Sequence, residues 1–286
     1  MVINVSYDLE TLASIVIEAA KTASQWLRDV QGNQYFTEFV KWSEEDVTRR
    51  FDVETENIIL EVFRREHVNA LFVSEEFGYK RFSEEPEYIV VIDPLDGSNN
   101  FTANIPYATV SIAVAKYSKK ATLRDIIVGV VSEIFREKIY YAIKGYGVFE
   151  NGKNLAKPKN IGSPFIFGYL NYEPYDVFKE LEKELGAFKL RSLGSASLDI
   201  VHVAKSVAGI FLDLRSKLRN VDVAAALLIL NEAGGKAKSY HLNLYDVPIT
   251  NVEKIYSIAA FSKDWGIKYE AIIDNIVMKT LVRRES

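Results

Sequence analysis

Residues 89–98 read IVVIDPLDGS, an apolar run that ends in two aspartates. Its first four residues are β-branched, which is typical of a buried strand. Asp93 and Asp96 therefore stand where the predicted strand leaves its sheet. Their carboxylates can converge on a cation, and the carbonyl oxygen of Leu95 is free once the strand ladder has ended. The stretch predicts a site for a hard, oxygen-ligated cation.

Gly97, Ser98 and Asn99 follow these acids and are predicted to open a short helix. Backbone N–H groups at the start of a helix can bind phosphate, so an anion site would lie beside the cation site. The same letters also suit an ordinary turn, because Asp-Gly and Asn-Asn pairs are common turn residues. This segment alone leaves both interpretations open.

Two further acidic elements occur at the ends of apolar segments. Glu75 and Glu76 follow the apolar run 71–73 after Ser74, and Asp222 begins a helix whose next residues are apolar through Leu230. Glutamates after a strand are usually solvated, and Asp222 could simply cap its helix, a contact worth about 0.5–2 kcal/mol. Three such elements together are much less easily explained as coincidence than each one alone.

The composition narrows the chemistry further. With 286 residues and 48% hydrophobic content, the chain can bury a sizeable core. Lys and Arg number 35 against 39 Asp and Glu, which excludes the basic excess typical of nucleic-acid binding. The absence of cysteine excludes disulfides, thiolate zinc sites and cysteine nucleophiles. Because there are only three histidines, carboxylates and water are the expected catalytic groups.

The sequence gives no sign of export or membrane insertion. The N-terminus has no basic segment followed by an apolar run, and no stretch of about 18 uncharged apolar residues occurs. We therefore expect a cytoplasmic protein with a small-molecule partner, without nucleic-acid or membrane partners.

Hydrophobic periodicity predicts an α+β chain. Apolar residues at helical spacing predict helices over 8–30 and 52–68, separated by a polar loop over 31–45. Short β-branched runs predict strands at 70–73, 88–92, 107–115, 126–134 and 139–143, and those after residue 107 are expected to form an antiparallel meander. In the second half of the chain, strands and helices are expected to alternate. The strands are predicted at 165–170, 188–192, 209–214 and 255–261, and the helices at 175–185, 196–205, 222–233 and 265–281.

Turn-forming residues gather between positions 150 and 164 and predict a boundary near residue 155. Residues 1–155 are expected to form an N-terminal α+β part with most of the acids. Residues 156–286 are expected to form a C-terminal α/β part that supplies Asp222 and the residues setting substrate specificity.

Two segments resemble signatures of the inositol monophosphatase and fructose-1,6-bisphosphatase superfamily. Residues 93–101, DPLDGSNNF, resemble the first signature, D-P-[IL]-D-G-[TS]-x-N-F. Residues 221–225, VDVAA, followed by EAGG at 232–235, resemble the second, in which Val221 replaces the usual tryptophan. The segments 46–52 and 213–215 look closest to the archaeal type, which acts on inositol 1-phosphate and fructose 1,6-bisphosphate.

The resemblance implies a layered αβαβα sandwich and a magnesium-dependent phosphatase, with manganese as a substitute metal. Glu75, Asp93 and the carbonyl of Leu95 would hold one ion, and Asp93, Asp96 and Asp222 would hold a second. A looser third ion would contact Glu75 through water. Clustered carboxylates repel one another, and divalent cations relieve that repulsion.

The resemblance also implies the catalytic and phosphate-binding groups. Ser98, oriented by Asp52, would position the attacking water together with Glu75, and Gly97 and Ser98 would hold the phosphate. From local sequence, Asp52 is equally well explained as a first-turn acid of its helix. Lys41 could approach the phosphate or be solvated, and Asp46 matches a second acid of the family's loop.

The remaining implied residues would contact the substrate away from the scissile phosphate. They are Arg191, Gly194, Ser195, Ala196, Asp213 and Arg215. Arginines here suit a second phosphate, although surface arginines at strand ends are equally common. A homodimer is expected from the family. The alternatives are a nucleotide 3′-phosphatase on the same metal core and a non-catalytic protein that binds metal or phosphate.

Overall fold

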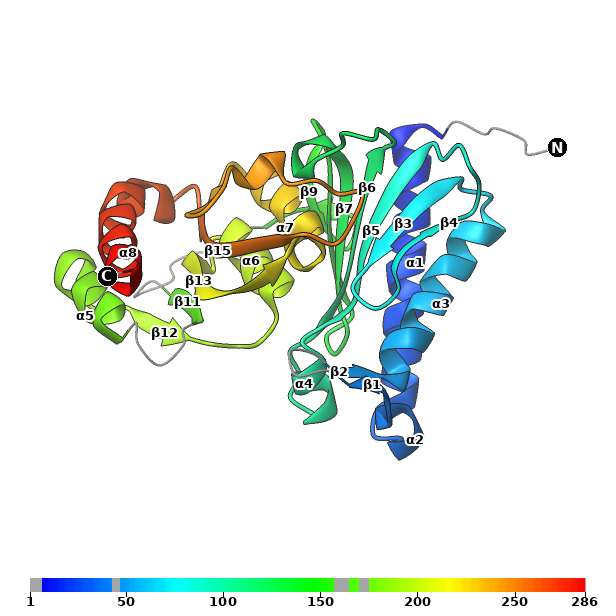
Figure 1. Cartoon of the computed structure of the whole chain (residues 1–286), viewed down its shortest axis with the longest axis horizontal. Helices are drawn as coiled ribbons and strands as arrows, with labels where there is room; N and C mark the ends of the chain where they lie inside the picture. Colours follow the sequence, from blue (N-terminus) through cyan, green and yellow to red (C-terminus); the bar gives the residue numbers. More distant parts are fainter. Residues whose placement is uncertain (1–6, 43–46, 157–164, 170–174, 286) are drawn as a thin grey trace.

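Two mixed β-sheets alternate with three layers of helices in the computed structural model (Figure 1). It describes residues 7–42, 47–156, 165–169 and 175–285. The order of the layers is the predicted αβαβα, and the α+β fold class is confirmed.

The first sheet has eight strands, five of which correspond to predicted runs. Strands β6 to β9 form the expected antiparallel meander, and β5 pairs with β3 in parallel and with β6 antiparallel. In spatial order the strands are β10 (Lys153–Asn154), β9 (Gly147–Glu150), β8 (Lys138–Ile143), β7 (Ile126–Glu133), β6 (Thr109–Lys116), β5 (Tyr88–Asp96), β3 (Ala70–Ser74) and β4 (Gly78–Arg81).

Helices cover both faces of this sheet. On the outer face, α1 (Leu9–Val30) and α3 (Arg50–Arg65) bury an apolar stripe against the strands. Asp8 caps α1 by accepting a hydrogen bond from the backbone N of Thr11 at 2.7 Å. The inner face carries α6 (Ala196–Ala204) and α7 (Asn220–Glu232). Helix α7 is apolar on nearly every side because it is enclosed between the two sheets.

The second sheet has five strands and is covered on its far side by two outer helices. The helices α5 (Tyr175–Leu185) and α8 (Glu270–Glu285) pack on it through a separate apolar cluster that includes Val177, Ile210 and Ile273. In spatial order the strands are β12 (Lys189–Arg191), β11 (Phe165–Tyr169), β13 (Ala208–Arg219), β15 (Lys254–Phe261) and β14 (Lys236–Ser239).

The polar segment 31–45 is not a plain loop, and that prediction was wrong. Helix α2 (Gln34–Thr37) and strand β1 (Phe39–Trp42) lie within it, and β1 pairs with β2 (Val47–Arg49). Elements of three or four residues are too short to show a period in the sequence. Exposed strand β4 and the edge strands β10 and β14 escaped prediction because they are short and polar, without alternating apolar residues.

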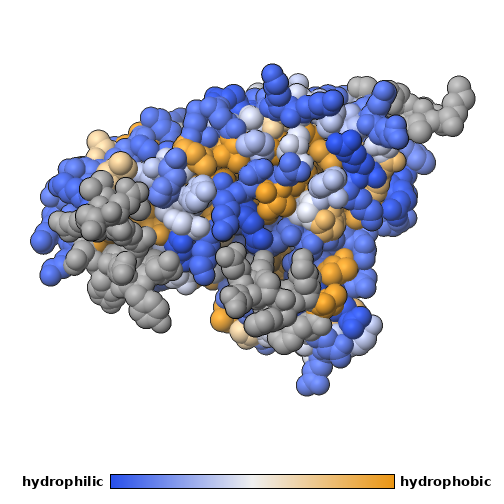
Figure 2. All heavy atoms as spheres, in the orientation of Figure 1, coloured by the Kyte–Doolittle hydropathy of each residue, from blue (hydrophilic) through white to orange (hydrophobic). Residues whose placement is uncertain are grey.

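The division near residue 155 remains a proposal. The first sheet ends at Asn154 and the second begins at Phe165, yet α6 and α7 follow that point and pack on the first sheet. The two parts therefore share one core. Among the described helices, none is long and apolar enough to cross a membrane. The face shown in Figure 2 is mainly hydrophilic, with apolar residues in separate groups.

Candidate functional site

A cavity of about 680 Å³ lies where the two sheets approach each other. Its walls come from the end of β5 with the start of α4 (Ser98–Thr102), the loop before α6, and the junction of β13 with α7. The lining residues are Glu75, Asp93, Leu95, Asp96, Gly97, Ser98, Asn99, Tyr169, Gly194, Ala196, Arg215, Ser216, Lys217, Leu218, Arg219, Asp222 and Lys254.

Three acids predicted as metal ligands meet in this cavity. Glu75, Asp93 and Asp222 each offer one carboxylate oxygen, and these oxygens lie within 4.8 Å of one another. Parallel pairing of β3 with β5 explains part of this arrangement. Because Ser74 lies opposite Ile92, Glu75, which follows β3, and Asp93, which is still paired with Ser111 within β5, lie at the same end of the two strands.

The third acid, Asp222, comes from the helix that follows strand β13 of the second sheet. Asp222 lies in the first turn of α7, directly after β13, and accepts a hydrogen bond from the backbone N of Arg219 at 2.8 Å. Asp222 is therefore both a helix cap and a member of the acidic cluster. The sequence left open whether Asp222 is a helix cap or an acid of the cluster, and in the structure it is both.

Burial and mutual repulsion disfavour charge on these acids. Burial, followed by the charges of Asp96 and Asp222, holds the pKa of Asp93 well above its ordinary value. Burial likewise raises the pKa of Asp222 to about 7, against the opposing influence of Arg219. The donors are all oxygen atoms, which hard cations prefer. A divalent cation such as magnesium would also offset the negative charges that burial and repulsion disfavour, so the site fits such an ion.

Asp96 lines the cavity but is engaged by α6. Its Oδ2 accepts hydrogen bonds from Ser195 Oγ at 2.7 Å and from Ser197 N and Oγ at 2.7 and 2.5 Å. Its Oδ1 accepts from the backbone N of Ala196 at 3.1 Å. Asp96 thus joins the first sheet to the N-terminus of α6, a set of contacts that the sequence did not predict.

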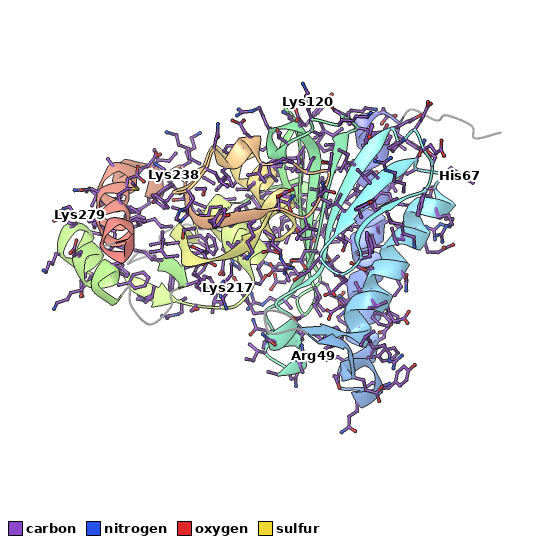
Figure 3. The ribbon with its side chains drawn as sticks, in the orientation of Figure 1. Arg49, His67, Lys120, Lys217, Lys238 and Lys279 are labelled. Carbon is purple, nitrogen blue, oxygen red and sulfur yellow. The ribbon has the colours of Figure 1, made fainter. Side chains whose placement is uncertain are left out.

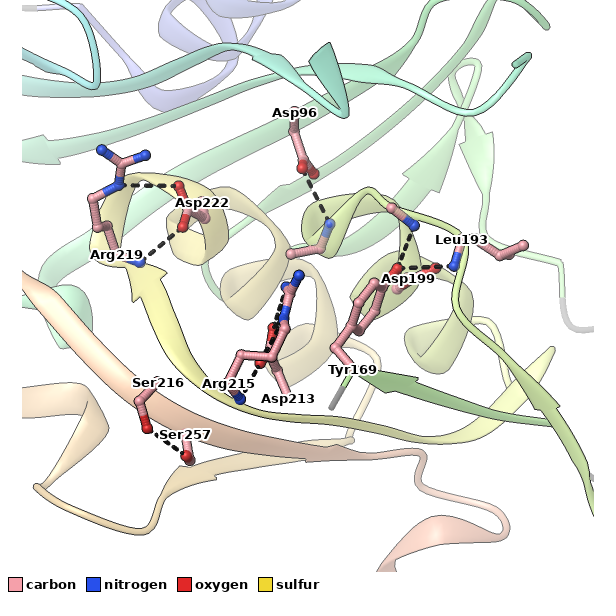
Figure 4. A network of polar contacts seen from close by, with 12 residues as sticks. Asp96, Tyr169, Leu193, Asp199, Asp213, Arg215, Ser216, Arg219, Asp222 and Ser257 are labelled. Carbon is pink, nitrogen blue, oxygen red and sulfur yellow. Dashed lines mark hydrogen bonds and ion pairs between the residues drawn. The ribbon is translucent and has the colours of Figure 1, made fainter. Parts of the chain in front are cut away.

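Arg219 was not predicted from the sequence, although it lies three residues before Asp222. Its guanidinium donates a hydrogen bond from Nη2 to Glu75 Oε1. Its Nε lies 4.0 Å from Asp222 Oδ1 (Figure 4). A positive charge is thereby placed between two of the three clustered acids. In the sequence, Arg219 could have been noticed as a basic residue three positions before an acid at the start of a predicted helix.

Asp52 occupies the first turn of α3, buried behind the cavity. Its Oδ2 accepts a hydrogen bond from the backbone N of Arg49 at 2.8 Å, which is the capping contact considered from the sequence. Burial raises the pKa of Asp52 to about 8. Within the described part of the chain, no hydrogen bond joins Asp52 to Ser98. The orientation of Ser98 by Asp52 therefore stays a prediction.

Two glycines bring the start of α4 close to the loop before α6. Gly97 has a φ of 94°, and a Cβ there would lie 2.9 Å from the carbonyl oxygen of Tyr107. Gly194 has a φ of 93°, and its Cβ would lie 2.7 Å from Asn100 Nδ2. Only glycine tolerates both this backbone conformation and this approach. The predicted phosphate-binding and substrate-binding segments are therefore neighbours.

Five of the six predicted substrate residues lie on the cavity wall or directly behind it. Gly194, Ala196 and Arg215 line the cavity. Ser195 and Asp213 lie buried immediately behind it, where Arg215 Nη2 donates to Asp213 Oδ2 at 2.6 Å and Ser195 donates to Asp96.

Arg191 is the sixth predicted substrate residue. It is exposed, donates from Nη1 to the carbonyl oxygen of Leu190 at 2.7 Å, and lies over the ring of Phe165. It is not among the described residues that line the cavity. We therefore leave Arg191 out of the proposed substrate site.

Tyr169 is a cavity residue that the sequence did not indicate, because it lies in an otherwise ordinary strand. Its Oη accepts from the backbone N of Leu193 at 3.0 Å and of Gly194 at 2.5 Å, and donates to Asp199 Oδ2 at 2.5 Å (Figure 4). The guanidinium of Arg215 lies 4.5 Å from the centre of its ring. Tyr169 therefore supports two elements of the predicted substrate site.

Two earlier predictions cannot be placed. Asp46 lies outside the described residues, and so does the side chain of Lys41.

Comparison with known proteins agrees with the sequence signatures. A model of the inositol monophosphatase family matches residues 8–272. An Aeropyrum pernix protein named inositol-1-monophosphatase is 30% identical over 260 residues, which cover 88% of this chain and 93% of the relative. A Thermococcus kodakarensis protein named fructose-1,6-bisphosphatase/inositol-1-monophosphatase is 32% identical over 216 residues, which cover 75% and 78%.

A further relative has a different name. A Methanococcus maripaludis bifunctional NADP phosphatase/NAD kinase is 27% identical over 242 residues, which cover 78% of this chain but 42% of that protein. Among solved structures, a Pyrococcus horikoshii protein described as similar to inositol-1 monophosphatase superposes with a TM-score of 0.74 at 28% identity, covering 96% of this chain and 99% of the other.

Proposed function

The chain belongs to the inositol monophosphatase family, and from this premise we propose that it is a magnesium-dependent phosphatase acting on inositol 1-phosphate, fructose 1,6-bisphosphate or both. The observation that carries the proposal is the convergence of Glu75, Asp93 and Asp222 within 4.8 Å. These acids share a cavity with Ser98 and with Arg215.

The proposed ligands are those implied by the resemblance. Glu75, Asp93 and the carbonyl oxygen of Leu95 would hold one ion, and Asp93, Asp96 and Asp222 a second, with a looser third ion near Glu75. Magnesium, or manganese in its place, supplies an activated water and neutralises charge on the phosphoryl oxygens when bound. All of these residues line the cavity. Asp96 would act as a ligand of the second ion while its carboxylate keeps its hydrogen bonds to the N-terminus of α6.

The protein groups around the reacting phosphate would orient it and the attacking water. Gly97 and Ser98 would offer backbone N–H groups at the start of α4 to the phosphate oxygens. The hydroxyl of Ser98 would position the water, with Asp52 as its orienting partner and Glu75 facing the same space. No covalent intermediate with the protein is required in this scheme.

The part of the substrate remote from the phosphate would face the loop before α6. Gly194 and Ala196 would contact substrate hydroxyls there, with Ser195 and Asp213 holding the wall behind them. Arg215 would contact a second phosphate, because a guanidinium can bind two phosphate oxygens at once. Its position on the cavity wall, supported by Asp213 and Tyr169, favours this role.

A second candidate is a phosphatase acting on a phosphorylated nucleotide. The observation in its favour is the relative named NADP phosphatase/NAD kinase; a nucleotide 3′-phosphatase would use the same metal core. A non-catalytic role is disfavoured because Glu75, Asp93, Asp96, Ser98 and Asp222 are all present. We also propose a homodimer, from the family resemblance alone, and, from the composition, a cytoplasmic protein without nucleic-acid or membrane partners.

A phosphate-release assay over a substrate panel tests this proposal. Inositol 1-phosphate, fructose 1,6-bisphosphate, NADP and a 3′-phosphorylated nucleotide would each be incubated with the protein in magnesium or in EDTA. We expect magnesium-dependent release from the first two substrates. Release from the nucleotides alone would replace the sugar-phosphatase proposal with the second candidate, and no release from any of the four would contradict both.

A further inference from the structure

We propose that Arg219 is a counter-ion fixed within the acidic cluster, where it competes with divalent cations for Glu75 and thereby sets the metal affinity of the site. This inference rests on the proposed metal centre and deepens it. It concerns a residue that neither the family signatures nor the sequence pattern singled out.

The contacts of Arg219 place it among the proposed ligands. Its Nη2 donates to Glu75 Oε1, and its Nε lies 4.0 Å from Asp222 Oδ1. Glu75 follows β3 of the first sheet, Asp222 lies in α7 after β13 of the second sheet, and they are two of the three acids whose oxygens converge. The guanidinium therefore uses the carboxylates that a cation would use.

The backbone fixes this position. Arg219 is the last residue of β13 and the N-cap of α7, and its backbone N donates to Asp222 Oδ2 at 2.8 Å. The capping contact holds Arg219 and Asp222 together whatever the side chain of Arg219 does. From this point the side chain of Arg219 reaches Glu75 on the opposite side of the cavity, while it stays beside Asp222 at the start of the helix (Figure 4).

The setting makes the ion pair stronger than an ordinary surface pair. The side chains of Arg219, Glu75 and Asp222 are 27%, 18% and 13% exposed. Charges that are mostly withdrawn from water are screened less by salt and attract or repel more strongly. Without a positive charge among them, three converging carboxylates would repel one another.

Two consequences of opposite sign follow from this arrangement. Loss of the guanidinium should destabilise the chain in EDTA, because the acids lose their counter-ion. It should also strengthen magnesium binding, because Glu75 no longer has to leave a charged donor and the incoming cation no longer meets a positive charge. A residue that merely held the ligands in place would instead weaken magnesium binding when removed.

The test compares the wild type with Arg219→Gln, which keeps a hydrogen-bond donor but removes the charge. Isothermal titration calorimetry with magnesium alone gives Kd, and thermal unfolding in EDTA gives Tm. We expect Arg219→Gln to bind magnesium about ten- to a hundredfold more tightly, corresponding to loss of one charge-assisted hydrogen bond. Its Tm in EDTA should be lower than that of the wild type.

Lys217→Gln is the matched control. Lys217 is an exposed cation that lines the same cavity from β13 (Figure 3). Its removal subtracts the same charge at a more solvated position, so we expect a change in Kd of less than about threefold. Similar effects of both variants would indicate a general charge effect and overturn the specific role of Arg219.

Arg219→Lys provides a second comparison if the glutamine variant does not fold in EDTA. Lysine keeps the charge but lacks the forked guanidinium, so it should tighten magnesium binding by a smaller factor than glutamine. Unchanged or weaker magnesium binding by the variant that folds would overturn the inference while leaving the metal centre intact. A wild type that binds no magnesium would overturn the proposed function together with it.

Discussion

Ser197 binds Asp96 through two hydrogen bonds, although the two residues lie 101 positions apart in the sequence. Both the backbone N and the Oγ of Ser197 donate to Asp96 Oδ2, at 2.7 and 2.5 Å. The same aspartate is a proposed metal ligand. The contact therefore links the metal site of the first sheet to the helix that carries the substrate loop.

Replacement of Ser197 by alanine should destabilise the protein measurably. The variant removes the hydroxyl donor to a buried carboxylate, and a hydrogen bond to a charged group contributes about 1.5–3 kcal/mol. Urea unfolding would measure the change in the free energy of unfolding. Ser14→Ala is the control, because Ser14 is exposed and its Oγ donates to the carbonyl of Glu10 within the same helix. Equal stability of the two variants would contradict this account of Asp96.

Asp52 can be tested with two substitutions that separate capping from catalysis. Asparagine can still accept the hydrogen bond from Arg49 N but cannot carry a charge, whereas alanine loses both functions. We expect each variant to lower kcat by about 10–100-fold. Only Asp52→Ala should also lose about 1 kcal/mol of stability through the missing cap. Full activity in Asp52→Asn, with an intact Tm, would leave Asp52 as a cap alone.

Arg215 should distinguish a bisphosphate from a monophosphate. Arg215→Gln is preferred to alanine, because glutamine can still donate to the buried Asp213. We expect kcat/KM for fructose 1,6-bisphosphate to fall about ten- to a hundredfold relative to inositol 1-phosphate, the effect of one charge-assisted contact. Arg191→Gln, outside the cavity, should change this ratio little. Equal losses on both substrates would argue against a second-phosphate site at Arg215.

Asp199 should make stability fall as the pH rises through neutrality. Burial raises the pKa of Asp199 from 3.8 to about 8, so the folded chain holds a proton that the unfolded chain has released. The free energy of unfolding then decreases between about pH 4 and 8, by at most about 1.4 kcal/mol per pH unit for one group.

Urea unfolding of the wild type and Asp199→Asn, at pH 6.5 to 8.5 and constant magnesium, would measure this contribution. Burial lowers the pKa of His202 to about 4, so His202 is neutral in the folded protein across this range. Its titration in the unfolded chain is common to both proteins and cancels in the comparison. The stability of the variant relative to the wild type should improve as the pH rises. Parallel stability curves would show that Asp199 is already ionised in the folded protein.

Physical patterns in the sequence predicted most of the helices and strands and part of the acidic cluster, whereas the order of the layers was implied by the family resemblance. Long amphipathic helices and β-branched strands have characteristic periods in the sequence, and acids at the ends of apolar runs can be recognised there. Glu75 and Asp93 were identified in this way, and the parallel pairing that brings them together was seen only in the structure. Asp222 could be placed with them only through the family signature, because nothing local relates α7 to the first sheet.

The remaining features depend on contacts between distant segments. The four hydrogen bonds that hold Asp96 come from residues about a hundred positions away. The reach of Arg219 to Glu75 spans 144 positions. No spacing rule relates such pairs. Tyr169 was missed for the same reason, since its importance lies in its backbone partners Leu193 and Gly194 and not in its own strand.

The central claim is that the cluster of Glu75, Asp93 and Asp222 holds magnesium and that this metal drives phosphate hydrolysis. The most direct measurement is phosphate release from inositol 1-phosphate and fructose 1,6-bisphosphate by the wild type and Asp93→Asn, each in magnesium and in EDTA. We predict release by the wild type in magnesium only and none above the blank by Asp93→Asn. Full magnesium-dependent release by Asp93→Asn, or equal release by the wild type in EDTA, would contradict the claim.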